Sequence, residues 1–353
     1  MGEMTGWRDA MQRALYGPDG FFSRPDRPGS TGHFRTSAHS SPLFATAMLR
    51  FVVAADEALG RPDPLDVVDI GAGRGDLLRR LAVLAPAYLQ ARLRLTAVEV
   101  AGPPEDLPPG ISWQSDPPPA NTVRGLLLAT EWLDNVPLDV AGVDDAGRLH
   151  YLLVDLDTGG ERMGGPLTAT DADWVDRWWG GPLRPGVRVE LGAPRDEAWA
   201  GAVGALDQGV ALTVDYGHLW GARPLWGTLT AFHEGRVTST VPDGSRDLTA
   251  HVAFDSVAAA GERVAGAPAV LTSQRTALRA LGLDGARPPL GLASTDPAGY
   301  VRALSAATQA ADLTDPDGLG GHFWLVQPVQ IDPETLPAGL PPPWTPPPMD
   351  VAR

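Results

Sequence analysis

Apolar residues recur along the chain at two different spacings, and the spacing separates expected helices from expected strands. Residues 40–59 carry apolar side chains at helical intervals, which predicts an amphipathic helix there. Short apolar runs at 65–70, 92–100, 125–129 and 210–215 predict buried strands. Because helical stretches separate these runs, we expect an α/β fold in which crossover helices connect a parallel sheet.

The pattern changes between residues 138 and 205. Residues 140–143 and 149–156 flank a short turn, Asp-Asp-Ala-Gly, which is typical of a β-hairpin. Residues 168–200 then contain several tryptophans among acidic residues, and we interpret these as packing of a core or a lid. This stretch therefore predicts an insertion near the open edge of the sheet.

The composition excludes several kinds of chemistry. The 353-residue chain has no cysteine, which removes disulfides, thiolate metal sites and cysteine nucleophiles. All 28 basic residues are arginine, so a Schiff-base lysine and the lysine of a P-loop are also excluded. The seven histidines show no H-x-x-x-H or H-E-x-x-H spacing, and we expect no metal site.

Charge and hydropathy restrict the expected partners and location. A net charge of −15 repels a phosphate backbone, so we expect no nucleic-acid partner. No stretch approaches the roughly 18 consecutive apolar residues of a membrane-spanning helix, and we expect no membrane partner. The polar N-terminus lacks the apolar core of a signal peptide and the arginine-rich character of a transit peptide. We expect a cytoplasmic protein.

A glycine-rich loop, Gly71-Ala72-Gly73-Arg74-Gly75, follows the first predicted strand, and a helix is expected from Asp76. A chain that passes from a strand into a helix this quickly needs positive-φ conformations, which glycine adopts without strain. Glycines also allow a ligand to approach the backbone closely, and the helix N-terminus offers free N–H groups to an anion. Asp69, Gly71, Gly73 and Gly75 are therefore candidate cofactor-binding residues.

Glu99 ends the next predicted strand, where an acid can accept hydrogen bonds from both ribose hydroxyls of a bound nucleoside. This arrangement serves NAD and S-adenosylmethionine equally. A dinucleotide fingerprint, G-x-G-x-x-G, would place glycine at position 76, where this chain has Asp. The G-x-G-x-G spacing favours a methyltransferase over a dehydrogenase, and a glycine turn without a ligand stays open as a third interpretation.

Further motifs occur in the order found in one protein family. They are MQRALYGPDGFF at 11–22, GHFRTS at 32–37, TEWLDNVP at 130–137, DYG at 215–217, GTL at 227–229, DLTAHVAF at 247–254 and a stretch at 272–281. With the glycine loop, they resemble the MidA family, whose mitochondrial members are S-adenosylmethionine-dependent protein arginine methyltransferases that assist assembly of respiratory complex I. The resemblance covers residues 11 to about 327.

The resemblance implies a fold and a division of the chain. The expected fold is a seven-stranded Rossmann-like methyltransferase core with an N-terminal helical cap and an inserted substrate lobe. We expect the cap at 1–60, and the core at 61–327 with the insertion at about 138–205. Residues 328–353 are rich in proline and are expected to form an extended tail.

The resemblance also implies S-adenosylmethionine as cofactor and an arginine-bearing protein as substrate. Thr36 and Ser37, in the family-like stretch, are expected over the methionine end of the cofactor. The candidate catalytic residues are Glu131, Asp134, Asp247 and His251. The first two follow a strand, where open α/β sheets bind ligands, and acids can clamp a guanidinium. The resemblance brings the other two near the pocket.

Simpler roles stay open for some of these residues. Asp134 could cap the turn before Pro137, and Asp247 could be the N-cap of the following helix. The chain also departs from the family pattern, with His33 and Ala253 in place of aspartates and Thr130 in place of asparagine. These departures motivate an alternative function, an assembly or interaction factor with little catalysis. A nicotinamide-linked oxidoreductase is a third hypothesis, and oligomeric state is not predicted.

Overall fold

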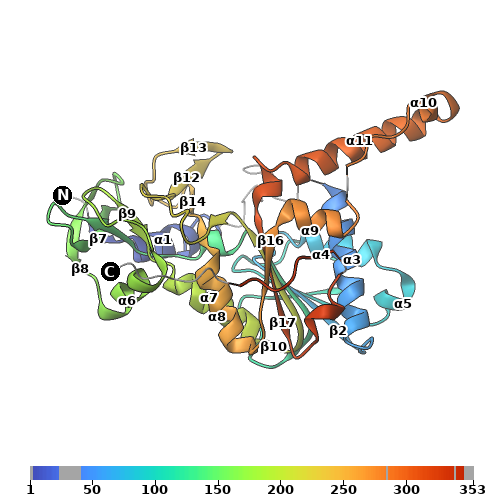
Figure 1. Ribbon diagram of the computed structural model, residues 1–353, viewed down its shortest axis with the longest axis horizontal. Coiled ribbons are helices and arrows are strands. Elements are labelled where there is room, and N and C mark those ends of the chain that lie inside the picture. The colour runs from blue at the N-terminus through green and yellow to red at the C-terminus, as the bar shows by residue number, and fades with distance from the viewer. Residues whose placement is uncertain (1–2, 24–40, 284, 338, 346–353) are drawn as a thin grey trace.

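The computed structural model describes residues 3–23, 41–283, 285–337 and 339–345. A seven-stranded sheet forms its core (Figure 1). In spatial order the strands are β16 (Val270–Ser273), β17 (Phe323–Val329), β10 (Leu206–Asp215), β5 (Val123–Thr130), β2 (Leu65–Ile70), β3 (Leu93–Val98) and β4 (Ile111–Gln114). The strands from β10 to β4 are parallel, and β17 is antiparallel to both of its neighbours. The predicted α/β fold class is confirmed.

Helices cover both faces of this sheet (Figure 1). One face packs on α3 (Pro42–Ala58), α4 (Asp76–Leu84), α5 (Ala87–Gln90), α9 (Gln274–Ala280) and α11 (Pro297–Thr314), and the other on α7 (Ala193–Gly204) and α8 (Phe254–Ala265). Successive strand residues point to opposite faces, so Val67 belongs to the first layer and Val68 to the second. Every residue of β2 is buried, as expected for a strand covered on both sides. In the described part of the chain, no helix is long and apolar enough to cross a membrane.

A second body, which we call the lobe, is built from residues 4–22, 138–191 and 217–253. Its larger sheet has the order β1 (Met4–Gly6), β7 (Leu149–Asp155), β6 (Val140–Val143) and β9 (Arg188–Glu190), with β8 (Glu161–Pro166) paired to β7. The helices α1 (Trp7–Tyr16) and α6 (Ala169–Trp178) pack against this sheet. Short strands complete it: β12 (Thr230–His233), β13 (Arg236–Thr238) and β14 (Asp247–Thr249) form one sheet, and β11 (Gly217–His218) pairs with β15 (Val252–Ala253).

The predicted N-terminal cap is not one packed unit. The apolar side of α3 packs on the core sheet, whereas Trp7, Met11 and Leu15 of α1 are buried in the lobe. The predicted insertion also extends too far, because α7 packs on α8 and β10 and thus belongs to the core. The lobe part of that segment ends near Leu191. The predicted hairpin is present as β6 and β7.

The predicted tail begins inside a strand. Pro328 and Val329 complete β17, where both face β10 residues. The described residues after them return to the core, since Leu336 is buried and the Trp344 N–H donates to the carbonyl of Ala269 at 2.8 Å. The apolar residues between the prolines account for this packing.

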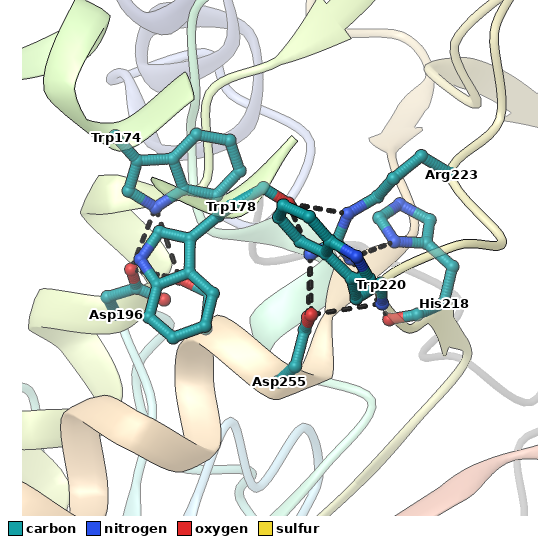
Figure 2. A network of polar contacts seen from close by, with 8 residues as sticks. Trp174, Trp178, Asp196, His218, Trp220, Arg223 and Asp255 are labelled. Carbon is teal, nitrogen blue, oxygen red and sulfur yellow. Dashed lines mark hydrogen bonds and ion pairs between the residues drawn. The ribbon is translucent and has the colours of Figure 1, made fainter. Parts of the chain in front are cut away.

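A buried ion pair joins the lobe to α8 (Figure 2). Arg223 donates to both carboxylate oxygens of Asp255, at 2.7 and 2.8 Å, and each side chain is 2% exposed. The same guanidinium donates to the carbonyl of Trp178 and to Nδ1 of His218. Burial, and then the Arg223 charge, lowers the pKa of His218 to about 3, so the imidazole is neutral and can accept.

Candidate active site

A cavity of about 650 Å³ lies where the parallel strands β2, β3, β5 and β10 end. The glycine loop, Glu99 and Glu131 line it on the core side. Tyr16, Phe232 and Thr249 line it from the lobe. The carboxyl ends of parallel strands are where open α/β folds bind their ligands, so this cavity is the candidate active site.

The glycine loop has the conformations that its sequence predicts. Gly71, Gly73 and Gly75 have φ of +70°, +60° and +75°. A Cβ on Gly71 would lie 3.1 Å from the Trp132 ring, whereas one on Gly73 would meet nothing within 4 Å. The Gly73 backbone therefore borders open space in the cavity, which suits close approach of a ligand. Gly75 does not line the cavity; it is the left-handed N-cap of α4, so its requirement is conformational.

Two carboxyl groups stand beside this loop. Glu99 accepts the Gly73 N–H through Oε2 and the Val100 N–H through Oε1, each at 2.9 Å. A carboxylate has about four acceptor sites, so it can accept more than two hydrogen bonds. Asp69 is buried at the end of β2, and this burial, with the nearby charge of Glu99, raises the pKa of Asp69 to about 7.

The opposite part of the cavity is acidic. Glu131 follows β5 with φ of +51°, and its N–H donates to the carbonyl of Val214 at 2.7 Å. Asp134 lies in the 3-10 turn η2 (Leu133–Asn135) and is 4% exposed. Its Oδ2 accepts hydrogen bonds from Tyr216 and Thr249, while its Oδ1 has no hydrogen-bond partner among the described residues. A buried carboxylate oxygen without a partner is costly.

Asp215 lies behind Asp134 and does not line the cavity. It accepts the Asp134 N–H at 3.1 Å. Burial raises the pKa of Asp215 well above its usual range, and the charges of Asp134 and Glu131 add to the rise. The acids at this edge of the sheet therefore oppose one another's ionisation.

Asp247 and His251 line the same cavity from the lobe side. Asp247 accepts a hydrogen bond from the Asn135 amide at 2.8 Å. His251 packs edge-on against the Tyr216 ring, with centroids 5.1 Å apart. Burial lowers the pKa of His251, which favours a neutral imidazole. All four predicted catalytic residues thus line one cavity with Asp69, Gly71, Gly73 and Glu99.

The structure removes two of the simpler roles. Asp134 makes no capping hydrogen bond in η2, since its side chain bonds to hydroxyls. Asp247 lies in β14, and the N-cap of α8 is Ala253. Ala253 itself packs with the tryptophans of the lobe and does not line the cavity, whereas Thr130 does. Thr36, Ser37 and His33 lie outside the described residues.

Aromatic residues of the cavity were not singled out from the sequence. Tyr16 stacks on Phe22 at 5.5 Å between ring centroids, and its hydroxyl donates to the carbonyl of Asn135 at 3.3 Å. Phe21, Phe232 and His322 also line the cavity. The segment at 11–22 was recognised as a motif, but only the packing of α1 in the lobe brings Tyr16 to the site. Aromatic rings beside carboxylates suit a cationic ligand.

In the described part of the chain, no three His, Asp or Glu side chains are close enough together to hold a metal ion. The polar groups of the cavity include carboxylates, hydroxyls, imidazoles, side-chain amides and backbone N–H groups.

Comparison with known proteins adds to this geometry. Residues 49–271 match the model of a family described as "Putative S-adenosyl-L-methionine-dependent methyltransferase". The protein arginine methyltransferase NDUFAF7 homolog, mitochondrial, of Drosophila melanogaster is 27% identical over 298 residues. That alignment covers 70% of this chain and 64% of the relative, less than two thirds of its length.

Two crystal structures from Burkholderia thailandensis have the same fold. One is a COG1565 superfamily member bound to S-adenosyl-homocysteine, 24% identical, with a TM-score of 0.75 over 94% of this chain and 89% of the other. The second, a COG1565 superfamily protein, is also 24% identical, with a TM-score of 0.77 over 96% and 91% of the two chains.

Proposed function

Because this chain belongs to the family of S-adenosyl-L-methionine-dependent methyltransferases, we propose that it methylates the guanidinium of an arginine side chain in a protein. One observation carries the choice of substrate: three acids, Glu131, Asp134 and Asp247, line the cavity that the glycine loop also lines. The Drosophila relative named as a protein arginine methyltransferase supports the same choice.

The residues on the core side fit the cofactor. Gly73 leaves open space at its Cα, and the N-terminus of α4 follows the loop and offers N–H groups to a carboxylate. Glu99 lines the cavity beside Gly73, and its carboxylate would accept the ribose hydroxyls. When bound, S-adenosylmethionine supplies an electrophilic methyl group on a sulfonium.

The acidic side would hold the substrate. A guanidinium presents N–H donors in a fixed plane, and two carboxylates can fix both its position and its angle. Glu131 and Asp134 would take this role, so that one guanidinium nitrogen faces the methyl group in line. A guanidinium must lose a proton on methylation, and the neutral His251 is the candidate acceptor.

The test is the double variant Glu131→Gln with Asp134→Asn. It keeps the shape of both side chains and removes both charges. We expect it to abolish transfer of labelled methyl groups to proteins in a cell lysate, while S-adenosylmethionine affinity by calorimetry changes less than about threefold. Asp145→Asn is a matched control, because Asp145 is exposed in the hairpin turn.

Other outcomes have distinct meanings. Transfer at the wild-type rate in a folded double variant would contradict the guanidinium assignment. A wild-type protein that binds the cofactor but labels no protein would favour the assembly-factor alternative. Gly73→Asp, which fills the ligand side of the loop with an acid, controls for transfer by contaminating enzymes.

A further inference from the structure

Arg195 is a fully buried arginine behind the acidic half of the cavity. It lies in the first turn of α7, the core helix that borders the lobe (Figure 1). Its exposed fraction is 1%, and it does not line the cavity. Burial lowers the pKa of Arg195, while the charges of Asp134, Glu190 and Asp215 oppose that change.

The guanidinium donates to backbone carbonyls from two separate segments. On the core side, Nη2 donates to the backbone carbonyl of Asp134 at 2.5 Å, and Nε donates to that of Val136 at 3.2 Å. On the lobe side, Nη1 donates to Ala250 at 2.8 Å and to His251 at 2.9 Å. Arg195 thus connects the backbone of Asp134 with that of His251, and both of these residues line the cavity.

His251 is fixed on its other side as well. Its N–H donates to the Thr228 hydroxyl oxygen at 2.8 Å. That hydroxyl donates to Oε2 of Glu190 at 2.7 Å. Oε1 of Glu190 accepts the N–H groups of Thr228 and Leu229, at 2.5 and 2.6 Å. The N–H of His251 is therefore held through Thr228, and its carbonyl by Arg195.

We infer that Arg195 is a positioning residue, which together with Thr228 fixes the His251 imidazole relative to the Asp134 carboxylate. The inference rests on the proposed function, in which these two groups hold the guanidinium and accept its proton. The rigid, planar fork of arginine can donate to several divergent carbonyls at once, which the single ammonium of lysine cannot do.

Arg195→Lys tests this role with the charge retained. Small misplacements of reacting groups cost about 10²-fold in rate, so we expect kcat to fall by about that factor. The cofactor site lies on other elements, and its Kd for S-adenosylmethionine should stay within twofold. Arg236→Lys, a conservative change on an exposed strand, should retain the wild-type kcat.

A second pair of variants keeps the test decisive if Arg195→Lys does not fold. Thr228→Val has nearly the same shape, but its side chain cannot bond to the His251 N–H or to Oε2 of Glu190, whereas Thr228→Ser retains the hydroxyl. We expect Thr228→Val to lose most of kcat and Thr228→Ser to recover most of that loss. Equal rates in the two variants would overturn the inference.

Amide hydrogen exchange separates failure of this inference from failure of the proposed function. In Arg195→Lys we expect faster exchange at residues 247–252 and unchanged exchange at 71–75. If the wild type transfers no methyl group to protein, the proposed function fails and the exchange rates alone decide the positioning role. The positioning role would be overturned if a folded Arg195→Lys protein had the wild-type exchange pattern. Where transfer occurs, its kcat would also have to equal that of the wild type.

Discussion

Replacing Glu99 by alanine should weaken cofactor binding without unfolding the protein. The carboxylate is 9% exposed and accepts the Gly73 and Val100 N–H groups, at 2.9 Å each. Hydrogen bonds to a charged group contribute about 1.5–3 kcal/mol. Loss of the ribose contacts should therefore raise Kd by roughly 10- to 150-fold.

The assay is calorimetric titration with S-adenosylmethionine and S-adenosylhomocysteine. Glu99→Gln retains one side-chain acceptor and should fall between the wild type and Glu99→Ala. Glu105→Ala, at an exposed acid in the loop after β3, is the matched control and should bind as the wild type does. A folded Glu99→Ala protein with Kd within twofold of the wild type would refute the assignment of Glu99 to the ribose.

Three further predictions concern stability and pH. The pKa of Asp69 is raised by burial from an ordinary 3.8 to about 7 in the folded state, so the folded state binds more protons than the unfolded chain between these values. Without cofactor, the free energy of unfolding should fall as pH rises from about 4 to 7, and Asp69→Asn should remove this part of the pH dependence. If urea unfolding shows the same pH dependence in Asp69→Asn, the pKa of Asp69 is not raised as described. Asp255→Leu leaves Arg223 buried without its ion-pair partner and should lower the free energy of unfolding in urea by about 3–5 kcal/mol. A loss below about 1 kcal/mol would contradict a stabilising role for this ion pair. Gly71→Ala places a Cβ 3.1 Å from Trp132 at positive φ and should lower Tm, whereas Gly201→Ala, in α7 with nothing within 4 Å, should raise it; the reverse order would contradict the account.

The parts of the fold set by local pattern could be predicted from the sequence. Buried parallel strands read as continuous apolar runs, so β2 and β10 were found, and the glycine loop follows from the sharp turn after β2. Among the strands of the core sheet, β17 and the edge strand β4 were not predicted. β4 has only four residues, and two of them are polar. β17 begins with the apolar run 323–326, but Gln327 and Pro328 interrupt it, and proline is unusual in an inner strand.

The lobe could not be predicted as a unit, because it joins segments far apart in the sequence. The apolar pattern of α1 shows that it packs, but not that Trp7 and Leu15 pack in the lobe rather than on the core. The same limit applies to the site. Glu131 and Asp134 were predicted because they follow a strand, whereas Tyr16 and Arg195 reach the site only through contacts distant in sequence.

Location and partners stay at the level of prediction. The cytoplasmic location expected from the sequence is untested, and the Drosophila relative is named as mitochondrial. The expected lack of a nucleic-acid partner rests on the net charge of −15 alone.

If this cavity transfers a methyl group to arginine, amino-acid analysis of labelled protein will identify the product. The purified protein is incubated with methyl-labelled S-adenosylmethionine and a lysate, and the labelled proteins are then hydrolysed to amino acids. We expect the label to elute with methylated arginine, and Asp134→Asn to remove it. Label on any other amino acid, or label that persists in a folded Asp134→Asn protein, would show that this cavity does not methylate arginine as proposed.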